Sequence, residues 1–302
     1  MTIFVKAGQH NGFHKEQITM PLMDYVSWSK CNAMLDSPRN FFEKYKHGRQ
    51  VRPATAAMEF GNLVHQAILE PRKFLDNYVI QPDFGAMQSP KNRAARDEWV
   101  ASAKGNGSII VTEDQADTIT KMHKRVMEHE AALKILTGGR AEGWAYFWEE
   151  NFGRYLLGRP DFLTNDGIVV EVKTTSKRVD RRTVMREIFN YGYHGQMALN
   201  CMAAGGILNI PDHKRGVWIF IKTTEPFDVA VYTASENVIL AGRSKVHRAI
   251  HQINEHLAVD PELSDPLKWL GVQGNYAEEL EFEPWMLRGD QDYEELTNEQ
   301  KP

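Results

Sequence analysis

The apolar run at residues 168–175 constrains this chain most, because it holds two opposite charges where a buried strand is expected. Side chains alternate between the two faces of a strand, so Glu171 and Lys173 point to the same side. Val170 and Val172 point to the other side. Burying charged groups costs free energy unless they are paired or coordinated. The pattern therefore predicts a strand whose charged face has a function.

A third charged residue, Asp161, precedes this strand across a short turn. The turn sequence at residues 164–167, Thr-Asn-Asp-Gly, contains the Asp-Gly pair typical of hairpins. A hairpin brings Asp161 close to Glu171 and Lys173. Two carboxylates beside an ammonium group suit a hard divalent cation and an attacking water. We therefore expect Asp161 and Glu171 to bind Mg²⁺, with Mn²⁺ as an alternative ion, and Lys173 to act on the water or the phosphate.

The length and composition fit a cytoplasmic protein with no membrane partner. The chain of 302 residues can form one large domain or two small ones. No apolar run approaches the roughly 18 residues that cross a bilayer, and the first residues lack a signal-peptide pattern. Only Cys31 and Cys201 are present, which excludes a disulfide framework and any four-cysteine metal cluster.

Hydrophobic periodicity predicts an α/β fold with an N-terminal helical portion. Helical patterns cover residues 24–45, with a break at Ser37-Pro38, and 56–69, 112–137, 182–204 and 236–257. Strand patterns cover 144–148, 154–157, 168–173, 217–222 and 229–232, and residues 81–107 read as a long loop with some helix. We expect one domain at 1–260, comprising helices at 24–70, a sheet at 142–233 and a closing helix at 236–257. An acidic extension then occupies residues 261–302.

A basic cluster follows the charged strand. It consists of Lys177, Arg178, Arg181 and Arg182, although the net charge of the chain is -4. Such a cluster can contact a phosphate backbone, so we predict that it binds DNA. The alternative is a solvated helix face.

This chain resembles the PD-(D/E)xK nuclease superfamily in its motif, which here consists of Asp161 followed by Glu171-Val172-Lys173. Other blocks resemble its RecE-like branch, the phage and prophage exodeoxyribonuclease VIII enzymes. These blocks are residues 60–65, a stretch of the expected helix at 56–69 that contains His65, then Ala141-Glu142 before a Trp-rich strand, and residues 191–196, which end in Gln196. Together with Ser37-Pro38 and the two phenylalanines after it, they cover roughly residues 24–257.

The resemblance implies roles for several further residues. His65 and Glu142 would join the metal ligands, and the carbonyl of Val172 would add another. Gln196 would either contact DNA or brace Lys173. Lys173 would orient or deprotonate the attacking water, or act only as an electrostatic clamp. The related RecB pattern has a tyrosine four residues after the glutamine, where this chain has Asn200.

The resemblance implies a metal-dependent exonuclease with a restriction-endonuclease-like core, in which helices flank a central mixed sheet. Such an enzyme would digest linear double-stranded DNA from its ends in the 5′→3′ direction and leave 3′ single-stranded tails. It would form a ring-shaped homo-oligomer and pass the tails to a single-strand annealing recombinase. Two other functions stay open, namely an endonuclease of the restriction or repair type on the same fold and a non-catalytic DNA-binding module.

Overall fold

The structure, a computed structural model, describes residues 3–4, 12–14, 18–21, 24–48 and 55–271. Its centre is a five-stranded sheet in the order β13-β12-β11-β10-β7. β11 (Val169–Thr175) and β12 (Gly216–Lys222) are parallel. β13 (Val229–Thr233), β10 (Phe162–Thr164) and β7 (Gly139–Ala141) pair antiparallel to their neighbours. The central sheet is therefore mixed, as predicted.

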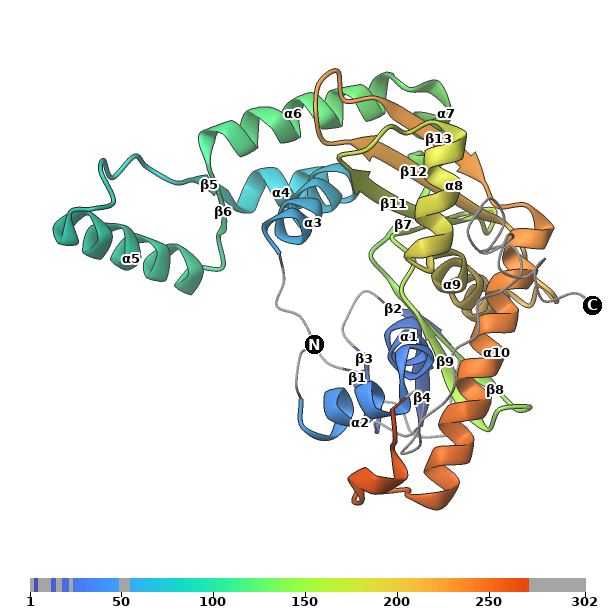
Figure 1. Ribbon diagram of the computed structural model, residues 1–302. Helices are drawn as coiled ribbons and strands as arrows, with labels where there is room; N and C mark the ends of the chain where they lie inside the picture. The colour runs from blue at the N-terminus through green and yellow to red at the C-terminus, as the bar shows by residue number, and fades with distance from the viewer. Residues whose placement is uncertain (1–2, 5–11, 15–17, 22–23, 49–54, 272–302) are drawn as a thin grey trace, which may run out of the picture.

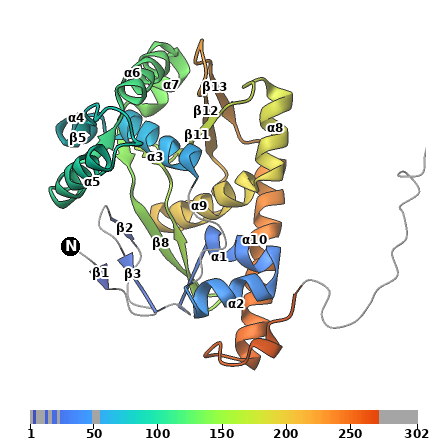
Figure 2. The ribbon, with the colours of Figure 1, turned by 60° about the vertical axis from the view of Figure 1, so that its left-hand side comes forward.

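Helices cover both faces of this sheet (Figures 1 and 2). On one face lie α3 (Ala56–Leu69) and α6 (Glu113–Glu128), followed by α7 (Glu130–Leu136). On the other lie α8 (Arg181–Asn190) and α9 (Tyr193–Leu208). The long helix α10 (Glu236–Val259) packs along α9. The predicted α/β architecture is confirmed.

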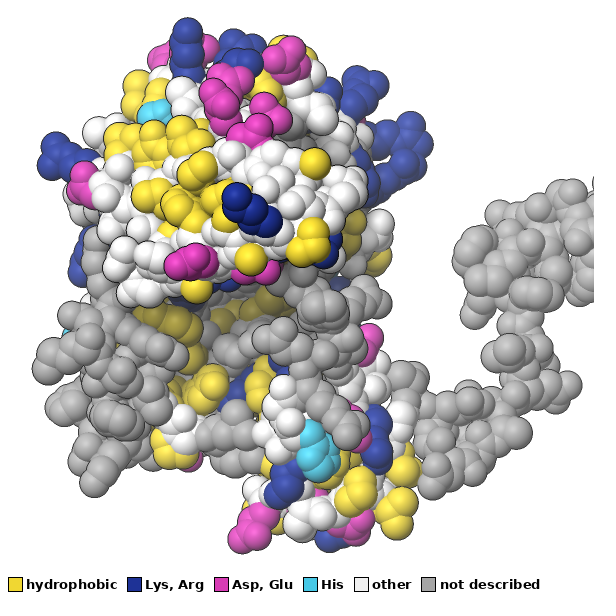
Figure 3. Space-filling view, turned by 90° about the vertical axis from the view of Figure 1, so that its left-hand side faces the viewer, with side chains coloured by type: hydrophobic (Ala, Val, Ile, Leu, Met, Phe, Trp, Pro, Cys, Tyr) yellow, Lys and Arg dark blue, Asp and Glu magenta, His cyan; other side chains and the backbone are white. Residues whose placement is uncertain are grey.

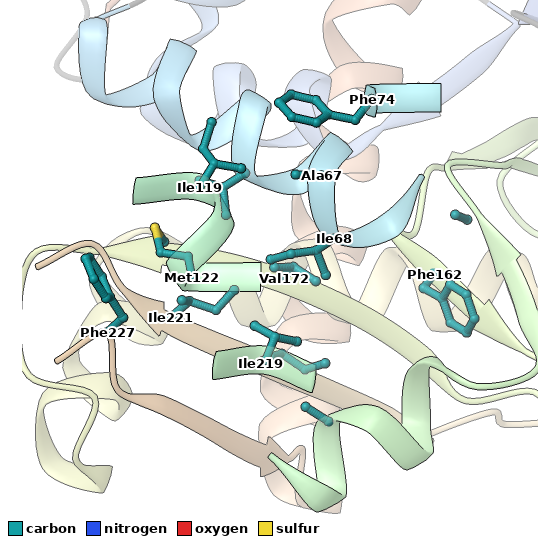
Figure 4. Packing of buried hydrophobic residues seen from close by; sticks show 14 of the residues in the cluster. Ala67, Ile68, Phe74, Ile119, Met122, Phe162, Val172, Ile219, Ile221 and Phe227 are labelled. Atoms are coloured by element: carbon teal, nitrogen blue, oxygen red, sulfur yellow. The ribbon is translucent and has the colours of Figure 1, made fainter. Parts of the chain in front are cut away.

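A hydrophobic core fills the space between this face of the sheet and the helices α3 and α6 (Figure 4). Val172 and Ile219 project from neighbouring strands into side chains from the two helices, among them Ile68 and Met122. All four side chains are at most 4% exposed, and burying each such group contributes roughly 1.5–3 kcal/mol. This packing fixes α3, and with it the position of His65, against β11.

The predicted strands 144–148 and 154–157 belong to a second sheet. β8 (Trp144–Glu149) and β9 (Arg154–Gly158) pair antiparallel, as the hairpin signal indicated, between β2 (Gly12–His14) and β4 (Tyr25–Ser27). A separate pair, β1 (Ile3–Phe4) and β3 (Ile18–Thr19), is parallel.

The expected helix at residues 24–45 is wrong at its start, because residues 25–27 form β4. Val26 is fully buried and pairs in parallel with Leu156, so tertiary pairing overrides the local helical pattern. α1 (Trp28–Asp36) and α2 (Pro38–Lys46) follow, separated at Ser37 as predicted. The Ser37 hydroxyl accepts a hydrogen bond from the backbone N–H of Asn40, which caps α2.

An arm extends from the body between α4 (Pro71–Asn77) and α6 (Figure 1). It contains the parallel pair β5 (Tyr78–Ile80) and β6 (Ile109–Val111) and the helix α5 (Pro90–Gly105). The helix replaces most of the loop expected at 81–107, because Ser89 caps it and a proline occupies its first turn. In Figure 3 the side of the molecule that carries the arm faces the viewer, and hydrophobic side chains gather on the upper part of that face.

The expected helix at 182–204 is divided at Gly192, whose φ of 69° is a left-handed conformation that glycine adopts without strain. A Cβ at Gly192 would lie 2.9 Å from the Trp28 ring of α1. None of the helices in the described ranges has the length and apolar character that crossing a membrane requires. Residues 272–302, most of the predicted acidic extension, lie outside the described residues.

Candidate active site

The charged face of β11 forms the floor of the site. Glu171 is fully buried, and its Oε2 accepts a 2.7 Å hydrogen bond from Lys173 Nζ. Val170 and Val172 point into the opposite core with α3 and α6. The strand therefore separates its charges from its valines as the alternation predicts.

The predicted hairpin brings Asp161 to this floor. β10 and β11 pair antiparallel, and the Gly167 N–H donates to the Thr164 carbonyl across the turn. Asp161 Oδ2 accepts a 2.7 Å hydrogen bond from the backbone N–H of Val172. The same oxygen lies 3.9 Å from Lys173 Nζ. Asp161 is thus fixed by the backbone of the strand that carries Glu171 and Lys173.

Three side chains from separate elements converge here with donor atoms that suit a metal ion. His65, Glu142 and Asp161 each offer one ligand atom, and these atoms lie within 4.8 Å of one another. His65 Nδ1 is 3.7 Å from Asp161 Oδ2. Two carboxylate oxygens and one imidazole nitrogen fit a divalent cation bound at about 2.0–2.6 Å from each ligand.

The close approach of α3 to β11 allows His65 to reach the cluster. Gly61 lies one turn before His65, and a Cβ there would be 3.1 Å from Thr174 Oγ1. Burial lowers the pKa of His65, although the nearby Asp161 carboxylate opposes this shift. The imidazole is therefore neutral at neutral pH, the form that binds metals.

Glu142 reaches the cluster through an unusual backbone conformation. Its φ of 53° is rare for a residue other than glycine, and such outliers concentrate at functional sites. Its N–H donates to the Asp161 carbonyl at 3.0 Å, which ties the β7–β8 connection to the site. Burial raises the pKa of Glu142, and the Arg159 guanidinium, which donates to Glu142 Oε2 at 2.6 Å, opposes that shift.

Glu171 sits apart from this cluster, with both carboxylate oxygens engaged. Lys173 donates to one oxygen, and Asn200 Nδ2 donates to the other at 2.6 Å. Burial raises the pKa of Glu171, while the Lys173 charge opposes the rise. Burial by itself would lower the pKa of Lys173, but the Glu171 and Asp161 charges outweigh it and raise that pKa. Metal binding by Glu171, and by the Val172 carbonyl, stays a prediction.

The predicted DNA-binding residues lie beyond the end of β11. Lys177 pairs with Glu187 at 3.2 Å, and Arg178 pairs with Asp180 at 3.4 Å. Arg181 and Arg182 are exposed at the start of α8. DNA contact by all four residues stays a prediction.

Gln196 is half-buried on α9. Lys173 donates to Glu171, and no hydrogen bond joins it to Gln196 within the described part of the chain. Both roles predicted for Gln196, contact with DNA and bracing of Lys173, stay predictions.

Sequence reasoning missed the parts that Asn200 and Arg159 play in this arrangement. Asn200 braces Glu171 and also accepts a hydrogen bond from the backbone of Arg159. The Tyr193 ring lies 5.2 Å from Lys173 Nζ. Two sequence positions could have pointed to these residues. Arg159 directly precedes the Pro160-Asp161 pair, and Asn200 lies four residues after Gln196, where the related pattern has a tyrosine.

Structural comparison shows a related fold at low sequence identity. A crystal structure from Eubacterium rectale, of a protein provisionally described as an exonuclease, matches with a TM-score of 0.53 and 12% identity. The match covers 88% of this chain and 94% of that one. The structure of Scheffersomyces stipitis Rai1 with (3′-NADP)⁺ and calcium ion gives a TM-score of only 0.26 at 13% identity, covering 80% of this chain and 71% of that one. That score does not indicate a shared fold. A search of curated proteins found no relative.

A family model for a PDDEXK-like domain of unknown function matches residues 27–263. The matched span contains the mixed sheet, its covering helices and every residue of the metal-ligand cluster. The PD-(D/E)xK fold read from the sequence is therefore confirmed, and this fold supports a nuclease. The chain belongs to the PDDEXK-like family DUF3799.

Proposed function

We propose that this protein is a metal-dependent exonuclease that digests linear double-stranded DNA. The observation that carries the proposal is the convergence of His65, Glu142 and Asp161 beside Lys173. The cluster supplies ligands for a divalent cation, and the lysine supplies a cation for the phosphate or the water. A bound divalent cation can activate the water and the phosphate, and a lysine beside it can offset the charge that develops on the phosphate.

A divalent cation held by His65, Glu142 and Asp161 would supply Lewis-acid activation of the phosphate and the water. Mg²⁺ is the ion we propose, with Mn²⁺ as the substitute, and Glu171 is a further candidate ligand. Lys173 is the group that orients the attacking water and offsets the charge developing on the phosphate. Glu171 holds Lys173 in place through its hydrogen bond, and Asn200 in turn holds Glu171 from the buried side.

The resemblance to RecE-like enzymes supports the direction and purpose of the reaction. We propose 5′→3′ digestion of one strand, which leaves 3′ single-stranded tails for a single-strand annealing recombinase. We also propose a ring-shaped homo-oligomer and a cytoplasmic location. Lys177, Arg178, Arg181 and Arg182 are proposed contacts to the DNA backbone. All four side chains are exposed, Lys177 and Arg178 before α8 and Arg181 and Arg182 at its start, which is consistent with this role.

One assay tests the proposal. Linear duplex labelled at one 5′ end, the same duplex labelled at one 3′ end, and a supercoiled circle are incubated with Mg²⁺ and wild-type protein or Asp161→Asn. The proposal expects immediate release of 5′ label from linear DNA by the wild type only. Equal inactivity of both proteins would contradict an enzyme. Cutting of the circle would favour an endonuclease instead.

A further inference from the structure

Two adjacent aromatic rings with a lysine at each end lead from the candidate active site to the surface. Lys173 Nζ lies 5.2 Å from the centre of the Tyr193 ring, and that centre lies 5.6 Å from the centre of the Tyr191 ring. Lys177 Nζ lies 5.5 Å from the Tyr191 ring centre. We call these four residues the tyrosine row. Its outer members, Tyr191 and the side chain of Lys177, are each 55% exposed.

The junction of α8 and α9 fixes the two rings. Tyr191 ends α8, and its N–H donates to the Glu187 carbonyl at 2.9 Å. Tyr193 begins α9, directly after the left-handed Gly192. Trp28 of α1 packs against this junction at Gly192 and Gly195. Because two helix ends and a buried contact hold the rings, a ligand would lose little free energy in ordering them.

Lys177 is paired in this structure, but its side chain stays open to solvent. Its partner Glu187 is 5% exposed and also accepts a 3.0 Å hydrogen bond from Thr175 Oγ1. The Glu187 carboxylate therefore keeps a partner when Lys177 turns toward another anion. The Lys177 ammonium group has three hydrogen-bond donors, and its side chain is 55% exposed, so a phosphate can bind it from the solvent side.

The tyrosine row has the chemistry of a site for unpaired nucleotides. An exposed ring offers a surface on which a base stacks, and the adjacent ammonium groups attract the phosphates between successive bases. Bases inside a duplex have their faces covered by their neighbours, whereas an unpaired strand exposes them. The inner end of the tyrosine row is Lys173, which lies 3.9 Å from Asp161 of the metal-ligand cluster. A DNA strand bound along the row would therefore place one of its phosphates at that cluster.

We propose that the tyrosine row binds unpaired nucleotides of the DNA strand next to the scissile phosphate, with a base stacked on Tyr191 and a phosphate on Lys177. The inference rests on the proposed nuclease function and deepens it, because it specifies which form of DNA the site accepts. The blunt end of a duplex, whose terminal base pair also exposes a face, is the competing ligand that the test must separate.

Binding is measured by fluorescence anisotropy in EDTA, so that no divalent cation supports cleavage. The probes are an oligothymidylate, an oligonucleotide of the same length with every base replaced by an abasic site, and a blunt hairpin duplex. The variants are Tyr191→Ala, Tyr191→Phe and Lys177→Gln. Phe189→Ala serves as the matched control, because Phe189 is an aromatic residue of α8 that is 69% exposed but lies outside the row.

We expect Tyr191→Ala to bind the oligothymidylate about 10-fold more weakly, as loss of one stacked base predicts. Tyr191→Phe and Phe189→Ala should bind as the wild type does. The abasic probe should bind wild type and Tyr191→Ala equally. Lys177→Gln should weaken binding of both single-stranded probes and reduce the salt dependence.

Wild-type affinity of Tyr191→Ala for the oligothymidylate would overturn the inference. An equal loss on the blunt hairpin, or a loss on the abasic probe, would overturn it as well. These outcomes are independent of the cleavage assay. If the protein digests DNA with Mg²⁺ but Tyr191→Ala binds the oligothymidylate as the wild type does, only the inference about the tyrosine row is wrong. If the protein is inactive but shows the expected binding pattern, only the proposed nuclease activity is wrong.

Discussion

Asn200 Nδ2 donates a 2.6 Å hydrogen bond to Glu171 Oε1 from 29 residues further along the chain. Both side chains are at most 2% exposed. Glu171 lies on the strand that carries Lys173, and Asn200 lies on the helix that covers the same face. The amide therefore satisfies the one carboxylate oxygen that Lys173 leaves free. A buried carboxylate is tolerated here because each oxygen has a donor.

Replacing Asn200 by alanine should leave that oxygen buried without a donor. We expect Asn200→Ala to lower the free energy of unfolding by about 1–3 kcal/mol. Urea unfolding followed by circular dichroism measures the change. Repeating the substitution in a Glu171→Gln background is the control, where the loss should be smaller because the group left unpaired is neutral. An unchanged urea midpoint for Asn200→Ala would show that the hydrogen bond contributes nothing.

The metal-ligand cluster predicts which side chains control the affinity for a divalent cation. His65→Ala, Glu142→Gln and Asp161→Asn should each weaken Mn²⁺ binding. Loss of a residue that only hydrogen-bonds to a metal ligand lowers the affinity roughly 10–100-fold, and loss of a ligand itself should cost at least as much. Isothermal titration calorimetry measures the affinity. Asp166→Asn is the control, because Asp166 is an exposed carboxylate on the adjacent hairpin turn that pairs with Arg215. Equal affinity in all four variants would mean that the ion binds elsewhere.

Lys173 is expected to affect the rate more than metal binding. Lys173→Met should reduce the rate of DNA hydrolysis by about 10²–10⁴-fold, the usual contribution of a positioned catalytic side chain. Mn²⁺ affinity should remain, since Lys173 offers no lone pair to the ion when charged. Lys121→Met, at an exposed lysine of α6 paired with Asp117, is the control and should retain full activity. A Lys173→Met enzyme as fast as wild type would restrict the lysine to a structural role.

The sequence predicted the strand, hairpin and charge alternation around Glu171, because each depends on residues close together in the chain. It predicted the PD-(D/E)xK fold through the same short pattern. The position four residues after Gln196 drew attention to Asn200, but its hydrogen bond to Glu171 could not be predicted, because it forms only when α9 packs on the sheet. Val26 illustrates the same limit, since its helical pattern gave way to pairing with a distant strand. Long-range packing thus decided the features that local patterns left open.

The end of α10 gives a prediction about pH. Asp260 is 2% exposed and accepts hydrogen bonds from Ser264 N (2.9 Å), Ser264 Oγ (2.8 Å), Asp265 N (3.0 Å) and Trp269 Nε1 (2.8 Å). Burial by itself would raise the pKa of Asp260, but these hydrogen bonds outweigh it and hold the pKa well below its usual value. Trp269 is fully buried and stacks on Phe41 of α2, with 5.6 Å between ring centres. The carboxylate therefore anchors the last described segment to the N-terminal helices.

Because the pKa of Asp260 is lower in the folded than in the unfolded chain, its stabilisation is complete above the unfolded value near 3.8 and is lost as the pH falls through the folded value. We expect Asp260→Asn to lower the melting temperature at pH 7, and the difference from wild type to shrink as the pH falls below 3.8. Thermal unfolding followed by circular dichroism across this range measures both effects. Asp265→Asn is the control. The Asp265 carboxylate accepts a hydrogen bond from the Leu267 N–H, and its substitution should destabilise the protein less. A difference between Asp260→Asn and wild type that stays constant down to the lowest pH would contradict stabilisation by the ionised carboxylate.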